Sequence, residues 1–331
     1  MLFRSLYLNN VMIYSFLLLY YWGIFMKKDL LRIDTLSKDQ ILDILNLADQ
    51  LKYEQKHGIE HPLLKGKTLG MIFEKASTRT RVSFETGMYQ LGGNALFLSH
   101  KDLQAERGEP VEDTARTLSR YVQGILIRTF SQEDLETFSK YSTVPVINGL
   151  TNDEHPCQVL ADLMTIRENK NILEGLKVAF IGDGHNMANS LMISCLKVGM
   201  NFSIASPEEY MSPKSYILRA KEIAERESVE FIVTTSPEEA VQNADVVITD
   251  VWTSMDQEDE SEKRLQAFKE YQVNWDLLKH ADENAIVLHC LPAHREQEIT
   301  SEVLEAFSDI IFSETENRLH VQKAILCKLM K

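Results

Sequence analysis

The sequence predicts an α/β fold with two domains, each a parallel sheet flanked by helices. Short apolar runs rich in Val and Ile recur along the chain, as expected for strands that are buried on both faces. Helical patterns lie between these runs, and strands that alternate with helices form parallel sheets. The length of 331 residues suits two domains of ordinary size, and the number of runs favours one sheet in each.

The first half of the chain opens with a helical pattern over residues 37–55. The strand candidates that follow it are TLGMIF (68–73), ALFLS (95–99), GILIRTF (124–130) and VPVIN (144–148). Between the first two, a helix is expected because Phe84, Met88 and Leu91 share one helical face, and the glycines that follow end it.

The second half contains a further set of strand candidates, KVAFIG (177–182), FSIAS (202–206), EFIVTT (230–235), DVVITD (245–250) and AIVLHC (285–290). A helix from Val159 to about Arg167 and the polar stretch ENKNILEG form a natural joint between the halves. We therefore expect one domain over residues 27–170 and another over residues 171–306. Parallel sheets bind ligands at the carboxyl ends of their strands, so motifs at those ends are the candidates for function.

Composition argues against several classes of partner. The formal charge is −14, with 49 acidic residues against 35 basic ones, which disfavours nucleic acid or an anionic membrane as the main partner. Cys157, Cys195, Cys290 and Cys327 lie far apart, with no CxxC pair and no zinc-site spacing. This pattern is typical of reduced thiols in a cytoplasmic protein, and it predicts no metal site.

The N-terminus does not fit the rest of the chain. Residues 11–26 are almost wholly apolar, but the run is short for a membrane span and has no A-x-A cleavage site. Lys27 and Lys28 follow it at once. We expect residues 1–26 to be an extension outside the fold; an uncleaved membrane anchor is the alternative.

A dense cluster of cations and hydroxyls occurs in STRTR, residues 77–81, shortly after the first strand candidate. At the start of a helix, free backbone N–H groups, the helix dipole, hydroxyls and an arginine together bind phosphate. The alternative is a serine N-cap with solvated arginines. Arg79 is nearer the helix start and should point at the ligand, whereas Arg81 should pair with a carboxylate of the protein itself.

The stretch HPCQVLADL, residues 155–163, places an imidazole and an amide beside a proline that starts a helix. His155 and Gln158 could both donate hydrogen bonds to a carbonyl oxygen and polarise it for attack. A purely structural histidine is the alternative, and this motif alone does not decide between the two.

Further candidates follow strands of the second half. Gly182 and Gly184 suggest a dinucleotide loop, but Met187 stands where the third glycine of that motif belongs. Asn186 could instead hold the α-carboxylate or ammonium group of an amino acid. Asp250, at the end of a buried strand, can hold an ammonium group, and Cys290 lies at another strand exit beside a proline turn.

Together, STRTRVSFE, HPCQVLADL and HCLPAHR resemble the carbamoyltransferases in their order and spacing. The pairing of D-x-W-x-S-M with HCLP resembles the ornithine carbamoyltransferases in particular. The resemblance covers roughly residues 27–331. It implies that the C-terminal helix, within residues 307–331, packs back on the first domain and completes it. It further implies that the first domain binds carbamoyl phosphate and the second binds ornithine.

The resemblance also implies a role for each matching residue. The implied ligands of carbamoyl phosphate are Ser77, Thr78, Arg79, Thr80, Gln104, Arg128, His155, Gln158, Cys290, Leu291 and Arg318. The implied ornithine contacts are Asn186, Asp250, Ser254 and Met255. The implied catalytic residues are Arg128, His155, Gln158, Asp250 and Cys290. Gln104 matches a residue whose loop reaches a neighbouring subunit's site in this family.

The expected activity is therefore carbamoyl transfer to the δ-amine of ornithine, giving citrulline and phosphate, without a metal or organic cofactor. The family's assembly implies a homotrimer or a multiple of it. The chain departs from the family pattern at His185, where Asn is usual, and at Asp256, where Gly is usual in a closing loop. The alternatives are transfer to another amine such as putrescine, a nicotinamide-dependent dehydrogenase, and an inactive homologue that acts as a binding subunit.

Overall fold

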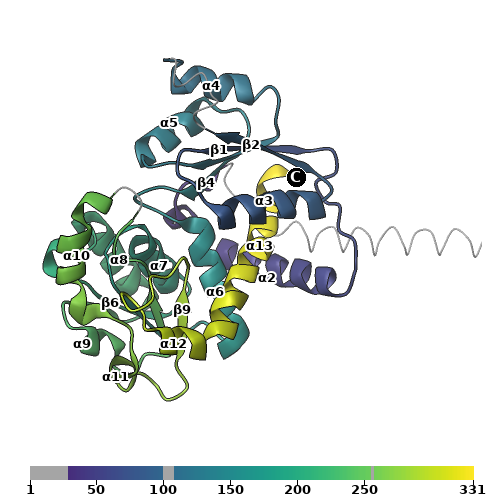
Figure 1. Ribbon diagram of the computed structural model, residues 1–331. Helices are drawn as coiled ribbons and strands as arrows, with labels where there is room; N and C mark the ends of the chain where they lie inside the picture. Colours follow the sequence, from purple (N-terminus) through teal and green to yellow (C-terminus); the bar gives the residue numbers. More distant parts are fainter. Residues whose placement is uncertain (1–28, 100–107, 255–256) are drawn as a thin grey trace, which may run out of the picture.

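The structure, a computed structural model, describes residues 29–99, 108–254 and 257–331. It contains two parallel sheets with helices on their faces, as predicted (Figure 1). The first sheet has the strand order β2-β1-β3-β4, formed by β1 (Thr68–Phe73), β2 (Asn94–Ser99), β3 (Gly124–Arg128) and β4 (Val146–Leu150). The second has the order β7-β6-β5-β8-β9, formed by β5 (Lys177–Ile181), β6 (Asn201–Ala205), β7 (Phe231–Thr234), β8 (Val246–Thr249) and β9 (Ile286–His289).

Every one of these strands falls on an apolar run that was predicted to be a strand. Most are buried on both faces, but β2 is an edge strand with exposed side chains. Leu96 is 49% exposed and Phe97 is 36% exposed, so the apolar composition of this run does not reflect burial within the chain.

The helices lie between successive strands and at the two ends of the chain. They are α2 (Lys38–Lys56), α3 (Thr78–Gln90), α4 (Val111–Leu118), α5 (Gln132–Tyr141), α6 (Pro156–Lys170), α7 (Asn186–Lys197), α8 (Lys214–Glu227), α9 (Pro237–Val241), α10 (Ser261–Ala267), α11 (Trp275–Leu278), α12 (Ser301–Ala306) and α13 (Ser308–Met330). Short 3₁₀ turns are η1 (Ile33–Thr35), η4 (Glu208–Tyr210), η5 (Glu258–Glu260) and η6 (Lys269–Tyr271). Among the described residues, no helix is both long and apolar enough to cross a membrane.

Local sequence explains where the helices next to the site begin. Ser77 caps α3, because its side chain accepts a hydrogen bond from the N–H of Thr80. Pro156 occupies the first turn of α6, where a missing N–H is harmless, and Asn171 ends that helix in a left-handed conformation. These boundaries fix the backbone of both motifs that the sequence singled out.

The C-terminal helix α13 joins the two halves of the molecule. It packs against α2, α3 and α6 and also contacts β9 of the second sheet, so it returns to the first domain as expected (Figure 1). The largest apolar cluster includes residues of both sheets together with α6 and α13. The two sheets are therefore held by one continuous core, which fixes their strand ends relative to each other.

The strand order brings the predicted site residues to one place. In the first sheet the chain steps from β1 to β2 on one side and then to β3 and β4 on the other. The second sheet reverses in the same way between β5 and β8. Ligands of open parallel sheets bind at such reversals, beyond the carboxyl ends of the strands.

Candidate active site

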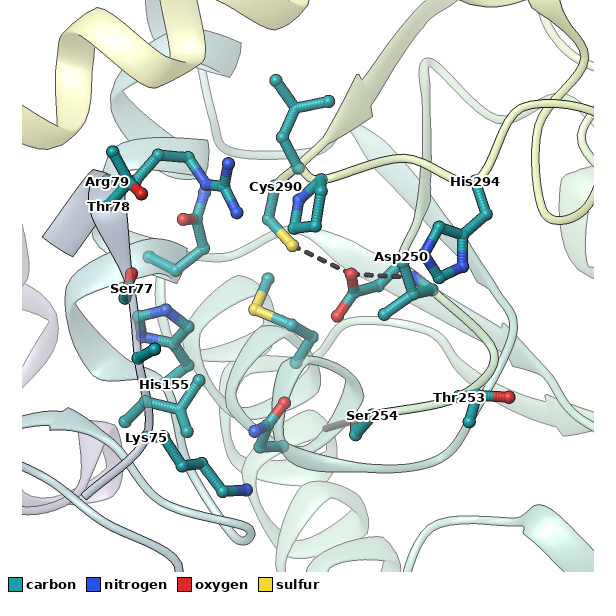
Figure 2. Close-up of a pocket in the computed structure, with 18 of the residues that line it drawn as sticks. Lys75, Ser77, Thr78, Arg79, His155, Asp250, Thr253, Ser254, Cys290 and His294 are labelled. Carbon is teal, nitrogen blue, oxygen red and sulfur yellow. Dashed lines mark hydrogen bonds between the residues drawn. The ribbon is translucent and has the colours of Figure 1, made fainter. Parts of the chain in front are cut away.

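A cavity of about 630 Å³ lies at these strand ends and is lined by residues of both halves of the chain. Most of the predicted site residues line it: Ser77, Thr78, Arg79, Arg128, His155, Gln158, Asn186, Asp250, Ser254, Cys290, Leu291 and Arg318. In Figure 2, Ser77, Thr78, Arg79 and His155 face Asp250 and Ser254 across the cavity, and Cys290 lies between the two groups. Gln104 and Met255 lie outside the described residues.

The turn before α3 supplies one wall of the cavity. Ser77, Thr78 and Arg79 line this wall at the positive end of the helix dipole. Thr80 does not line it: its buried hydroxyl accepts a hydrogen bond of 2.7 Å from the guanidinium of Arg318. Thr80 therefore positions Arg318 in this structure.

Arg81 behaves as predicted from its place further into the helix. Its Nε donates to the carboxylate of Glu85 at 3.0 Å, and its guanidinium lies 3.7 Å from the centre of the Phe97 ring. The side chain is thus used within the protein, and the prediction that Arg81 pairs with a carboxylate is confirmed.

Three arginines, Arg79, Arg128 and Arg318, converge on the cavity, and in the described part of the chain none of them forms a salt bridge. Arg128 and Arg318 are buried. Burial lowers the pKa of Arg128 to about 9, and the charges of Arg318 and Arg79 contribute to that decrease. Burial also lowers the pKa of Arg318, and Arg79 contributes again. Mutually repelling cations at an accessible cavity wall are a site for an anion.

His155 caps α6 and carries a neutral imidazole. Its backbone N–H donates to the hydroxyl of Ser190 at 2.9 Å, which fixes the residue against α7. Burial, followed by the charges of Arg318 and Arg128, holds the pKa of His155 well below its usual value. A neutral imidazole still offers one N–H, so His155 can donate a hydrogen bond to a ligand oxygen without adding a fourth positive charge.

Gln158 is oriented differently from the expectation. Its Nε2 donates to Asp162 Oδ1 and to Glu314 Oε1, each at 2.8 Å. Its carbonyl oxygen is buried and has no hydrogen-bond partner in the described part of the protein. Both N–H donors are thus used inside the protein, so the expectation that this amide donates to a carbonyl oxygen is wrong in this structure. The group that remains for a ligand is an acceptor.

Asp250 and Cys290 form the opposite side of the cavity. Asp250 follows β8 and Cys290 follows β9, and the thiol donates to the aspartate Oδ1 at 3.0 Å. Burial raises the pKa of Asp250. Burial also raises the pKa of the Cys290 thiol well above its usual value, and the charge of Asp250 adds to this effect. The sulfur is therefore a neutral hydrogen-bond donor, unlike a nucleophilic cysteine.

The sequence that forms these two walls matches one known family over most of its length. The model of the aspartate/ornithine carbamoyltransferase carbamoyl-P binding domain matches residues 28–168, and that of the Asp/Orn binding domain matches residues 174–329. The chain belongs to the aspartate/ornithine carbamoyltransferase family.

The chain also matches individual members of the family over nearly their whole length. The chain is 53% identical over 303 residues to ornithine carbamoyltransferase of Carboxydothermus hydrogenoformans, covering 92% of this chain and 97% of the relative. Among solved structures, ornithine carbamoyltransferase from Pyrococcus furiosus has 48% identity and a TM-score of 0.89, covering 93% of this chain and 98% of the other. The anabolic enzyme from Campylobacter jejuni has 43% identity and a TM-score of 0.87, covering 92% and 99%.

Asn186 is the first residue of α7 and lines the cavity. Its Nδ2 donates to the backbone oxygen of Thr151 at 2.8 Å, and Asn189 donates to Asp153 at 3.1 Å. These bonds tie α7 to the loop that carries His155. Asn186 lines the cavity while it is held in this way, so a ligand meets an asparagine whose orientation is already fixed.

A metal centre is not formed by the cluster that comes closest to one. In the described segments, side-chain atoms of Asp250, His289 and Cys290 lie within 4.8 Å of one another. Both nitrogens of His289 are already used, since Nε2 pairs with Glu298 at 3.0 Å and Nδ1 accepts the N–H of Leu291 at 2.9 Å. Two remaining ligands are fewer than a protein zinc site employs.

Several cavity residues were missed by the sequence analysis. Lys75 lines the cavity directly before the STRTR turn, with its ammonium 4.2 Å from the centre of the Phe130 ring. Thr253 and His294 also line it. Lys75 could have been included because it extends the same cationic stretch. Thr253 and His294 carried no signal beyond their place next to a quoted motif.

Proposed function

We propose that the protein transfers the carbamoyl group of carbamoyl phosphate to the δ-amine of L-ornithine and releases L-citrulline and phosphate. The observation that carries this proposal is the pairing, across one cavity, of two groups of side chains: three arginines that form no salt bridge within the described ranges, and the hydrogen-bonded Asp250–Cys290 pair. An anionic donor fits the first group and a cationic amino-acid acceptor fits the second. The carbamoyl carbon then lies between them.

The phosphate end of the donor is held by Arg79, Arg128, Arg318 and the turn before α3. Ser77 and Thr78 add hydroxyls and backbone N–H groups at the helix N-terminus. Burial and then the neighbouring arginines lower the pKa values of Arg128 and Arg318, and bound phosphate offsets both effects by adding a negative charge. The same cations stabilise the growing charge as phosphate departs.

The carbonyl of the donor is polarised by His155 and Arg128. The neutral imidazole donates one hydrogen bond to the oxygen, and the buried guanidinium stabilises the negative charge that develops there. Gln158 presents its carbonyl oxygen, which suits the amino group of the carbamoyl moiety. The protein thus contacts the donor at its phosphate, its carbonyl oxygen and its amino nitrogen.

The acceptor must react as a free amine. The δ-ammonium resembles that of lysine, with a pKa of about 10.4, so it must lose a proton before its lone pair can attack. The nitrogen–carbon bond forms, the carbon–oxygen bond to phosphate breaks, and the departing phosphate oxygen can take up the amine proton. Asp250 holds the α-ammonium, while Asn186, Ser254 and Met255 complete the acceptor site.

Putrescine is the second candidate acceptor, because it is a diamine: one of its amines can react while the other remains a cationic ammonium group. It lacks the α-carboxylate and α-ammonium that Asp250 and Asn186 would meet. A colorimetric assay for carbamoylated product, with ornithine, putrescine and aspartate offered in parallel, tests the proposal. Ornithine should give the highest kcat/KM; a higher value for putrescine or aspartate would overturn the assignment of the acceptor.

The proposed assembly is a homotrimer in the cytoplasm. It is supported by the exposed edge strand β2 and by large apolar side chains nearby, with Tyr89 81% exposed and Leu96 49% exposed. In such an assembly Gln104 would reach the site of a neighbouring subunit. Light scattering coupled to size-exclusion chromatography tests the assembly: a mass of one chain would contradict it.

We also propose that the domains comprise residues 27–170 with 307–331, and residues 171–306.

A further inference from the structure

Two buried carboxyl groups lie directly behind Gln158, on the side away from the cavity. Asp162 is one helical turn further along α6, and Glu314 projects from α13. Each residue is only 1% exposed, and Gln158 is fully buried. The side-chain nitrogen of Gln158 donates to both carboxyl groups at 2.8 Å, so it bridges two acids that come from helices far apart in the sequence.

The two carboxyl groups lie close together, because both accept a hydrogen bond from the same nitrogen of Gln158. Burial raises the pKa of both, and for Glu314 the neighbouring Asp162 adds to the increase. Two carboxylates this close repel each other, which favours a proton on one of them. Arg318, on the same helix as Glu314, is the cation that faces the pair.

The second oxygen of Glu314 accepts the backbone N–H of His289 at 3.1 Å. His289 ends β9 and directly precedes Cys290, so one carboxyl group connects Gln158 to the strand that supplies the opposite side of the cavity. Stability alone does not explain such a cluster, because replacing buried ionic groups by apolar ones of similar volume is often neutral or stabilising.

A glutamine amide can turn over with almost no change in shape, which exchanges its donor for its acceptor. In the turned-over form, the Gln158 oxygen would lie against the two carboxyl oxygens, and both hydrogen bonds from its nitrogen would be lost. The buried pair therefore selects the form in which the Gln158 carbonyl oxygen remains for a ligand.

We propose that Asp162 and Glu314, which both accept a hydrogen bond from the side-chain nitrogen of Gln158, are positioning residues that hold the Gln158 carbonyl oxygen toward the amino group of the carbamoyl donor. This inference rests on the proposed function for the identity of the donor. The pair itself does not contact the reacting atoms; it acts through Gln158.

The test is a double-mutant cycle with Gln158→Ala and Asp162→Asn, read out as kcat/KM for carbamoyl phosphate. An asparagine at position 162 can donate or accept, so it no longer selects one orientation of the amide. Asp162→Asn alone should lower kcat/KM about ten- to hundredfold. In the Gln158→Ala background it should have almost no further effect. Additive losses would show that Asp162 does not act through Gln158 and would overturn the proposal.

Two probes separate positioning from general damage to the site. Inorganic phosphate binds only the arginine wall, so its Kd should change less than twofold in Asp162→Asn and in Glu314→Gln. Acetyl phosphate carries a methyl group where carbamoyl phosphate carries an amino group, so both variants should lose discrimination between these two ligands. Equal weakening of all three ligands in both variants would overturn the proposal. Glu316→Gln, on the same helix but 41% exposed at its side chain, is the matched control and should behave as the parent.

The same double-mutant cycle can also be read out as the Kd for carbamoyl phosphate. This readout distinguishes a failure of the positioning role from a failure of the proposed function. If the parent makes no citrulline but the cycle in carbamoyl phosphate affinity is non-additive, the acceptor assignment fails and the positioning role stands. If Asp162→Asn does not fold, Glu314→Gln replaces it in the cycle with the same expected result and the same refuting one.

Discussion

Replacing Arg79 by alanine should separate phosphate binding from folding, because this side chain has no salt bridge to lose among the described residues. It lines the cavity, and its charge opposes those of Arg128 and Arg318. Removing it relieves repulsion in the free protein and leaves the bound phosphate with one charge-assisted hydrogen bond fewer.

The expected size follows from that bond. Hydrogen bonds to charged groups contribute about 1.5–3 kcal/mol, and truncating a buried charge pair costs about 2–5 kcal/mol. At about 1.4 kcal/mol for each factor of ten, a loss near 3 kcal/mol lowers kcat/KM for carbamoyl phosphate by about a hundredfold. The melting temperature of the free protein should stay unchanged or rise slightly.

Arg81→Ala is the matched control, two residues along the same helix. It removes an exposed i,i+4 salt bridge to Glu85, worth about 0.3–0.5 kcal/mol, and a cation–π contact with Phe97, worth about 0.5–1 kcal/mol. Its melting temperature should fall, while its affinity for carbamoyl phosphate stays within twofold of the parent. Calorimetric titration and thermal melts on both variants decide the matter. Unchanged carbamoyl phosphate affinity in Arg79→Ala would show that Arg79 does not bind the phosphate.

His155→Asn should lower kcat by about a hundred- to a thousandfold with little change in phosphate affinity, as for loss of one oxyanion donor, and steady-state kinetics check this; an equal loss of phosphate affinity would contradict it. Cys290 should react slowly with iodoacetamide at pH 7.5, and Asp250→Asn should speed the reaction because the aspartate charge helps to raise the thiol pKa; peptide mass spectrometry gives the rates, and a slower reaction in the variant would count against this role of Asp250. Burial raises the pKa of Glu154 to about 7, above its unfolded value, so the folded state binds more protons between about pH 4.5 and 7 and the contribution of Glu154 to stability is lost as pH rises through this window. The melting temperature should therefore fall less between pH 5 and pH 8 for Glu154→Gln than for the parent. An equal fall in both proteins would contradict the raised pKa of Glu154.

Local pattern accounts for the parts of the fold that could be predicted from sequence. The apolar runs are strands because a parallel sheet buries both of its faces, and the STRTR turn is a cavity wall because it follows the carboxyl end of β1. Phe97 shows where that logic stops. An edge strand has the same apolar composition as a central one, and only the strand order reveals that β2 lies at the edge.

The orientation of Gln158 could not be predicted, since it depends on a partner distant in the sequence. Asp162 stands inside the quoted HPCQVLADL motif, but Glu314 is 156 residues away from Gln158 and reaches it only because α13 packs against α6. Thr80 gives the same lesson: its hydroxyl was assigned to phosphate, and it accepts instead from Arg318 on α13. Sequence motifs identify which residues gather at a site, whereas their hydrogen-bond partners follow from tertiary packing.

Isotope labelling can show directly whether the carbamoyl group is transferred to the δ-nitrogen of ornithine. The enzyme would be given ¹³C-carbamoyl phosphate and ornithine labelled with ¹⁵N at the δ position, and the products followed by NMR together with released phosphate. We expect a one-bond ¹³C–¹⁵N coupling in citrulline and one phosphate for each citrulline formed. Phosphate release without that coupling, or a carbamoyl group on the α-nitrogen, would contradict transfer to the δ-nitrogen.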